Sequence, residues 1–135
     1  MRVIVDTSIW SLALRRHVII QNSEVELLST IIKNGENIFL LGIILQEILQ
    51  GVRKPQDFIR LKEYFEPFPL IEIEREDYIR AAELKNHLSR NGIQVSTIDA
   101  LIAAASIVND CYLHTDDKDF SHIARHSKLK LLKNP

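Results

Sequence analysis

The chain has 135 residues, of which 46% are hydrophobic and 26% charged, and its formal net charge is −1. This length suits one domain with its own core, so we expect residues 1–135 to form a single domain. The lone Cys111 excludes an internal disulfide, and the balanced charge argues against a strongly basic nucleic-acid wrapper. The apolar stretch at residues 38–45 is too short for a membrane helix, and no secretory signal pattern opens the chain. We therefore expect a soluble, cytoplasmic protein without a membrane partner.

Short apolar runs alternate with helical patterns along the chain. Residues 3–5 are a continuous β-branched run, which predicts a strand covered on both faces. A helix follows from near Ser8, and a capping box that starts at Ser23 opens a second helix. Further strands are predicted at residues 38–41, 70–73, 111–113 and 129–132, and further helices at 44–52, 56–65, 75–90 and 98–108.

This alternation of strands and helices indicates the fold class. It implies right-handed crossovers and a mainly parallel, five-stranded sheet with helices on both faces, which is an α/β/α sandwich. Ligands of such sheets bind beyond the carboxyl ends of the strands, at the point where the strand order reverses. The residues that follow each strand are therefore the first candidates for a functional site.

Four carboxylates stand out by position, namely Asp6, Glu47, Asp99 and Asp117. Asp6 follows the first strand and Asp117 the fourth, so both would meet at one sheet edge if these strands are neighbours. Each acid also has a purely structural interpretation. Asp6 and Asp117 suit helix N-caps, and Asp99 suits a capping box with Ser96.

Glu47 needs a separate argument, because a single Glu on an amphipathic helix is usually solvated. Glu47 flanks the apolar stripe of its helix rather than opposing it, and Gly51 leaves the adjacent turn uncovered. A glycine inside a helix costs about 1 kcal/mol. We therefore interpret Gly51 as room for the close approach of another group.

The place of Asp99 depends on the segment before its helix. If the helix at 75–90 runs back to the amino edge of the sheet, residues 91–96 must return to the carboxyl edge to bring Asp99 beside Asp6. Six extended residues span roughly 20 Å, so this return is possible but not forced.

Convergence of three or four carboxylates would have a chemical consequence. Each like-charged pair at about 4 Å costs on the order of 4 kcal/mol, and a hard cation such as Mg²⁺ or Mn²⁺ relieves this repulsion. Such an ion can activate water and hold a phosphodiester oxygen. The acidic residues then predict phosphodiester hydrolysis.

Four segments carry a family resemblance: VIVDTSIW at 3–10, QEILQG at 46–51, STIDALIAA at 96–104 and TDDKDF at 115–120. In order and spacing they resemble the four motifs of PIN-domain ribonucleases, and especially those of the VapC-type toxins of toxin–antitoxin modules. The resemblance covers essentially the whole chain. It implies a flavodoxin-like PIN sandwich with a Mg²⁺- or Mn²⁺-dependent endoribonuclease site.

The resemblance also assigns roles residue by residue. It gives catalytic roles to Asp6, Glu47, Asp99 and Asp117, and it makes Asp6, Asp99 and Asp117 ligands of the metal ion. Supporting hydroxyls are those of Thr7, Ser8 and Thr115. Two further acids are Asp116 and Asp119, either of which could contact a ligand of the ion or a second ion. It implies three partners: an RNA substrate such as tRNA or another structured RNA, a small cognate antitoxin protein, and a second copy of the chain in a homodimer.

Some polar residues keep two interpretations. His114 stands where an apolar strand residue is usual, and is either a histidine satisfied within the sheet or a proton carrier. The near-neutral charge offers little general affinity for RNA phosphates. Basic residues that follow the acidic motifs are candidates for an RNA groove, or else ordinary solvated helix ends. They are Arg15, Arg16, Arg53 and Lys54.

Two other functions remain as alternatives. A phosphatase with Asp6 as covalent nucleophile expects a second acid where Ser8 stands. A non-catalytic PIN-like module that binds RNA or protein would use its acids only as helix caps. Capping alone does not require Glu47 within a helix, which favours the nuclease.

Overall fold

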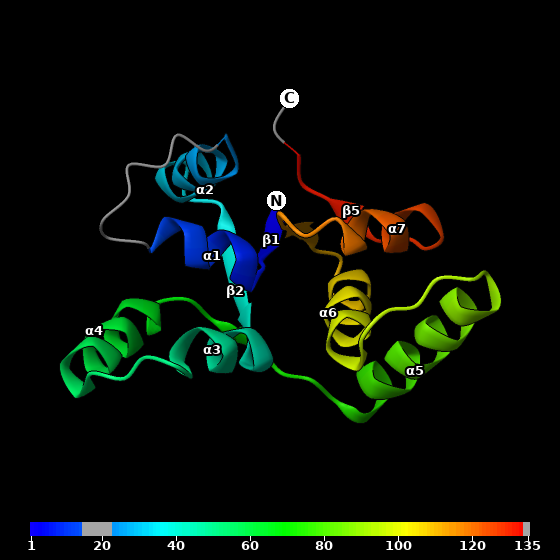
Figure 1. Ribbon diagram of the computed structural model, residues 1–135. Helices are drawn as coiled ribbons and strands as arrows, with labels where there is room; N and C mark the ends of the chain where they lie inside the picture. Colours follow the sequence, from blue (N-terminus) through cyan, green and yellow to red (C-terminus); the bar gives the residue numbers. More distant parts are fainter. Residues whose placement is uncertain (15–22, 134–135) are drawn as a thin grey trace.

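A computed structural model describes residues 1–14 and 23–133 (Figure 1). Five strands form one sheet in the order β3-β2-β1-β4-β5, and every neighbouring pair is parallel. The strands are β1 (Arg2–Val5), β2 (Asn37–Leu41), β3 (Leu70–Ile71), β4 (Tyr112–His114) and β5 (Lys130–Leu131). The predicted α/β sandwich with a parallel five-stranded sheet is confirmed.

Helices cover the sheet in two layers. They are α1 (Thr7–Ala13), α2 (Ser23–Lys33), α3 (Gly42–Leu49), α4 (Pro55–Phe65), α5 (Arg75–Arg90), α6 (Thr97–Val108) and α7 (Asp119–Arg125). In Figure 1, α1 to α4 lie in the left half of the view and α5 to α7 in the right half, and contacts between helices follow the same division. Right-handed crossovers require this division, because the strand order reverses between β1 and β4. No helix in the described part of the chain is both long and apolar enough to cross a membrane.

The hydrophobic core explains the continuous apolar runs. Val3, Ile4 and Val5 are completely buried, because β1 is the central strand and helices pack on both of its faces. On the α1 side, the ring of Trp10 makes an edge-to-face contact with Phe65 of α4, with centroids 4.9 Å apart. The core thereby fixes the start of α1, which directly follows β1.

The structure corrects the interpretation of Gly51. Helix α3 ends at Leu49, so Gly51 lies beyond it, and the predicted continuation to Val52 is wrong. Gly51 has a φ of +86°, and a Cβ added there would meet no atom within 4 Å. The glycine is used for a left-handed backbone conformation after the helix, and not for close approach of another group. Strand β3 is also shorter than predicted, since it pairs with β2 only at Leu70 and Ile71.

The segment between α5 and α6 settles where α6 begins. It runs back along α5 (Figure 1), and Lys85 in α5 donates a hydrogen bond from Nζ to the carbonyl oxygen of Val95. Helix α6 therefore starts at the carboxyl edge of the sheet, near the end of β4. This is the return that residues 91–96 had to make to bring Asp99 towards Asp6.

Candidate metal centre

Asp6 lies where the strand order reverses, immediately after the central strand. Its backbone N–H donates to the carbonyl oxygen of His114 at 2.9 Å, which extends the β1–β4 pairing by one step. Asp6 occupies the N-cap position of α1, yet its side chain makes no capping hydrogen bond. Only 6% of the residue is exposed. The carboxylate is therefore turned away from a capping role and towards the neighbouring strand end.

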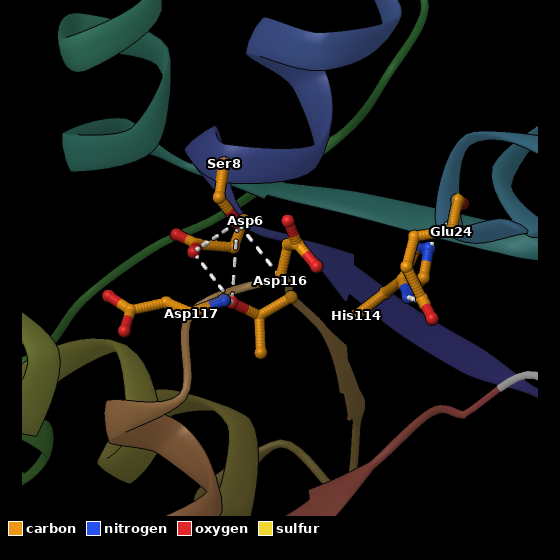
Figure 2. A network of polar contacts seen from close by, with 7 residues as sticks. Asp6, Ser8, Glu24, His114, Asp116 and Asp117 are labelled. Atoms are coloured by element: carbon orange, nitrogen blue, oxygen red, sulfur yellow. Dashed lines mark hydrogen bonds and ion pairs between the residues drawn. The ribbon is translucent and has the colours of Figure 1, made fainter. Parts of the chain in front are cut away.

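Two hydroxyl groups hold this carboxylate, as Figure 2 shows. Ser8 Oγ donates to Asp6 Oδ2 at 3.0 Å, and Thr115 Oγ1 donates to the same oxygen at 2.8 Å. Each hydroxyl also accepts a backbone N–H, Ser8 from Asp116 at 3.1 Å and Thr115 from Asp117 at 3.0 Å. One network thus fixes Asp6 and the start of the segment that carries Asp117.

A second set of carboxylates gathers at the starts of α6 and α7. Asp99, Asp117 and Asp119 each offer a carboxylate oxygen, and these oxygens all lie within 4.8 Å of one another. Asp117 Oδ1 accepts the backbone N–H of Asp119 at 2.9 Å, so Asp117 also has the local capping role considered for it. Ser96 Oγ accepts the backbone N–H of Asp99 at 3.0 Å, which starts α6 and places Asp99 in its first turn.

The electrostatics tie Asp6 to this set. The pKa of Asp99 is raised from 3.8 to about 6, first by burial and then by the charges of Asp117 and Asp6. A hydrogen bond with Ser96 lowers it only in part. Asp99 therefore experiences both Asp117 and Asp6, the two acids that follow neighbouring strands.

Glu47 faces the same region from α3. Thr7 Oγ1 donates to Glu47 Oε1 at 3.3 Å, and Thr7 directly follows Asp6 in the chain. Burial raises the pKa of Glu47, the charge of Asp6 raises it further, and the hydrogen bond from Thr7 lowers it. Glu47 is thus not the fully solvated residue of the ordinary interpretation. Asp6 is the acid whose charge acts on Glu47.

His114 makes one side-chain hydrogen bond within the fold, and its buried Nδ1 has no hydrogen-bond partner among the described residues. The residue is fully buried, and its Nε2 lies 2.8 Å from the carbonyl oxygen of Glu24 in the first turn of α2, a contact in which the ring N–H donates. Its Nδ1 lies 3.6 Å from Glu24 Oε2, an ion pair when the ring is protonated. Figure 2 shows this pair beside the Asp6 network. His114 therefore joins α2 to the strand end that carries Thr115.

The remaining predicted residues differ in how near they lie to this centre. Asp116 is exposed, with its backbone N–H bound to Ser8 as described. Arg53 and Lys54 are exposed between α3 and α4, where Lys54 is the N-cap residue of α4. Arg15 and Arg16 lie outside the described residues.

The sequence left open whether Asp116 or Asp119 contacts a metal ion. The geometry groups Asp119 with Asp99 and Asp117, whereas Asp6 is linked to them through charge and through the hydroxyl network. Two acids separated by one residue at a helix start were the available signal. Glu24 carried no signal, because nothing local in the sequence shows that it meets His114.

The donor set fits a hard divalent cation. All candidate ligands are carboxylate oxygens, and the oxygens are close enough to share one ion. Burial raises the pKa of Asp99, the charges of Asp117 and Asp6 raise it further, and a cation would offset both effects. Oxygen ligands of this kind suit Mg²⁺ or Mn²⁺, and the set lacks the thiolate and imidazole groups that zinc favours. Asp99, Asp117 and Asp119 could hold such an ion, with Asp6 beside them.

Comparisons with known proteins concern the fold and the family of the chain. A sequence comparison with curated proteins finds no match. Among solved structures, the fold is similar to VapBC2 from Rickettsia felis bound to a DNA fragment from the promoter, with 23% identity, a TM-score of 0.78 and 98% of each chain covered. It is also similar to VapBC-1 from nontypeable Haemophilus influenzae, with 18% identity, a TM-score of 0.76 and coverage of 98% of this chain and 97% of that one.

A third similar structure is a toxin–antitoxin complex from Klebsiella pneumoniae, with 19% identity, a TM-score of 0.68 and coverage of 88% of this chain and 90% of that one. These likenesses concern the fold. The family model of the PIN domain matches residues 3–126, which include all four acidic motifs. Because that match spans most of the sequence, the chain belongs to the PIN-domain family.

Proposed function

We propose that the protein is a Mg²⁺- or Mn²⁺-dependent endoribonuclease that hydrolyses RNA phosphodiester bonds. The observation that carries this proposal is the convergence of Asp99, Asp117 and Asp119 beside the buried Asp6, with the pKa of Asp99 raised to about 6. Helix caps do not require acids from separate parts of the chain to meet. A site that binds a cation and a phosphodiester does.

Each residue has a distinct part in this proposal. Asp6, Asp99 and Asp117 are the proposed metal ligands, and the geometry adds Asp119 as a candidate. Ser8 and Thr115 orient the Asp6 carboxylate, while Thr7 orients Glu47. When bound, the ion would polarise a phosphodiester oxygen and lower the pKa of a bound water. Glu47, whose pKa is raised by burial and by the charge of Asp6, is the proposed catalytic acid outside the metal ligands.

We further propose that the chain is the toxin of a toxin–antitoxin pair. The similar structures include VapBC proteins and a complex described as toxin–antitoxin, and the chain aligns with them over nearly its full length. A small antitoxin protein and a homodimer are the partners that follow from this proposal. Co-expression with the antitoxin and sedimentation of the purified chain at micromolar concentration test the two partners separately.

The activity is tested by incubating the purified chain with structured RNA, including tRNA, in the presence of Mg²⁺ or Mn²⁺. We expect cleavage within the RNA that EDTA abolishes and that Asp99→Asn lowers by about 100-fold or more. Asp57→Asn is the matched control, because Asp57 also lies in the first turn of a helix but not at the candidate centre. Cleavage that survives EDTA, or full activity of Asp99→Asn, contradicts the proposal. RNA binding without cleavage in any metal supports the non-catalytic module instead.

A further inference from the structure

A hollow of about 280 Å³ adjoins the candidate metal centre. The two share a wall, formed by Thr115, Asp116 and Asp117. Beyond this wall the hollow extends over the ends of β4 and β5, with Glu24 of α2 on one side and Ser121 of α7 on the other. A group bound in the hollow would therefore lie directly beside anything held by Asp117.

Both acidic and basic residues line the hollow. Three acidic residues line the hollow, Glu24, Asp116 and Asp117, and their charges oppose a phosphate group seated among them. Two lysines, Lys118 and Lys133, also line it, and both are exposed. Because both side chains are exposed, their charges can attract phosphates in solvent, and the exposed Asp116 lies in the same lining. The hollow thus favours a ligand that has anionic groups at its ends but not in its middle.

The inner wall on the β5 side is apolar. It is formed by Leu131 and Leu132, which follow each other at the end of β5 and are both half-buried. The backbone N–H of Leu132 donates to the carbonyl oxygen of Leu113 at 2.9 Å, so this wall is fixed to β4. A rigid aliphatic surface can pack against the face of a flat ring.

We propose that this hollow receives the nucleoside next to the scissile phosphodiester, with Lys118 and Lys133 at the flanking phosphates. The proposal deepens the proposed endoribonuclease function and rests on it. A nucleoside has an uncharged ring and hydroxyl or amino donors for the carboxylates, and phosphates lie only at its two ends. These are the properties that the lining favours. A net charge of −1 gives the chain little general attraction for RNA, so a local pocket has to supply contact with the substrate.

The size of the hollow also favours a single nucleoside over a peptide segment. A volume of about 280 Å³ is near the lower end of what small-molecule pockets provide. An extended peptide of a protein partner would need a longer groove, and its main chain carries no anionic groups for the two lysines. The peptide is therefore the alternative outcome of the test.

The test combines a filled hollow with an RNA that lacks one base. A short RNA cut by the wild-type chain is resynthesised with an abasic nucleotide at each position in turn. We expect kcat/KM to fall by about 10-fold to 100-fold at one position beside the cut and to change little elsewhere. Ser121→Phe, which fills the hollow, should cause a similar loss with intact RNA. Ser121→Phe should cause no further loss of kcat/KM with that abasic RNA, because the substitution and the missing base remove the same interaction.

Controls separate this result from a general loss of structure. Ser89→Phe makes the same substitution at an exposed position of α5 and should leave cleavage unchanged. Lys133→Glu, at an exposed position, should lower kcat/KM without lowering the melting temperature. Mn²⁺ affinity of each variant should stay within about twofold of the wild-type value, since none of these residues is a proposed ligand.

The outcomes distinguish the two proposals. If the wild-type chain cuts no RNA with Mg²⁺ or Mn²⁺, the endoribonuclease proposal fails and the nucleoside pocket falls with it. If RNA is cut but no abasic position costs more than about twofold, or the losses simply multiply, only the nucleoside pocket is refuted. If Ser121→Phe spares cleavage and abolishes binding of the antitoxin, the hollow belongs to a protein partner.

Discussion

Replacing Asp99 by Asn should make the metal-free protein more stable, although it removes a proposed ligand. The folded state holds the proton of Asp99 more tightly than the unfolded chain does, because burial, Asp117 and Asp6 raise its pKa from 3.8 to about 6. The metal-free protein therefore loses stability as the pH rises from about 4 to about 6. Above that range wild-type Asp99 is ionised and destabilising, whereas an amide at this position is neutral at every pH.

The size of this effect follows from the pKa. A rise of roughly two pH units corresponds to about 3 kcal/mol if taken at face value. Asp99 is only partly buried, so solvent screening reduces the expected gain to about 1 kcal/mol. For a chain of this length that gain raises the melting temperature by about 4 °C at pH 8. Near pH 4 the gain should disappear, because wild-type Asp99 is then protonated.

With Mn²⁺ bound, the wild-type protein should be more stable than Asp99→Asn. A ligand at 100 times its dissociation constant stabilises the folded state by about 2.7 kcal/mol, more than the metal-free advantage of Asp99→Asn. Thermal melts at pH 4 and pH 8, with EDTA or with Mn²⁺, provide the assay. Asp57→Asn is the control and should be slightly destabilising in all four conditions, since a first-turn acid favours the helix dipole. A metal-free Asp99→Asn that melts below the wild-type protein at pH 8 refutes the reasoning.

Three further predictions concern the same site. Mn²⁺ affinity should rise by about tenfold for each pH unit up to pH 6 and level off above about pH 7, because binding displaces the proton of Asp99. A calorimetric affinity that does not depend on pH contradicts this prediction. Thr115→Val should lower kcat/KM by about 10-fold to 100-fold and Thr115→Ser by much less. The reason is that the hydroxyl donates to the Asp6 carboxylate and accepts the backbone N–H of Asp117. Equal activities of the two variants would exclude a role for the hydroxyl. Lys85→Met should weaken Mn²⁺ binding by about tenfold, and Lys85→Arg should preserve it. Lys85 donates a hydrogen bond to Val95, in the segment that leads to α6 and Asp99. Unchanged calorimetric titrations for both variants would show that this hydrogen bond does not position α6.

Much of the fold could be predicted, because parallel strands and their helices leave strong local patterns. The apolar run at 3–5 indicated the central strand, and residues 75–90 were predicted with the bounds that α5 has. Gly51 shows the limit of such reasoning. A glycine within a helical pattern and a glycine just after a helix have the same spacing, and only the φ of +86° distinguishes them.

Residues of the candidate site that directly follow strands were easier to predict than those that lie at the starts of helices. Asp6 and Thr115 follow strands, so the parallel sheet alone brings them to one edge, and their hydrogen bond at 2.8 Å agrees with this. Asp99 was not determined in that way, because its place depends on a six-residue return that is fixed by a long-range contact between Lys85 and Val95. The grouping of Asp119 with Asp99 likewise depends on how α6 and α7 meet, which no local pattern contains.

Asp6 and Asp99 differ in how far the protein itself compensates their charges. Hydrogen bonds within the fold hold Asp6, whereas the pKa of Asp99 stays raised. Asp6 accepts two hydroxyl groups, and those hydroxyls are held in turn by backbone N–H groups, so this acid needs no cation to be kept in place. Asp99 lies in the first turn of α6, where the positive end of the helix dipole offsets part of the repulsion from its neighbours. The offset is incomplete, because the pKa of Asp99 stays near 6 in spite of the hydrogen bond with Ser96. Asp99 is thus a partly buried acid beside like charges, an unfavourable arrangement that a divalent cation at this place would relieve.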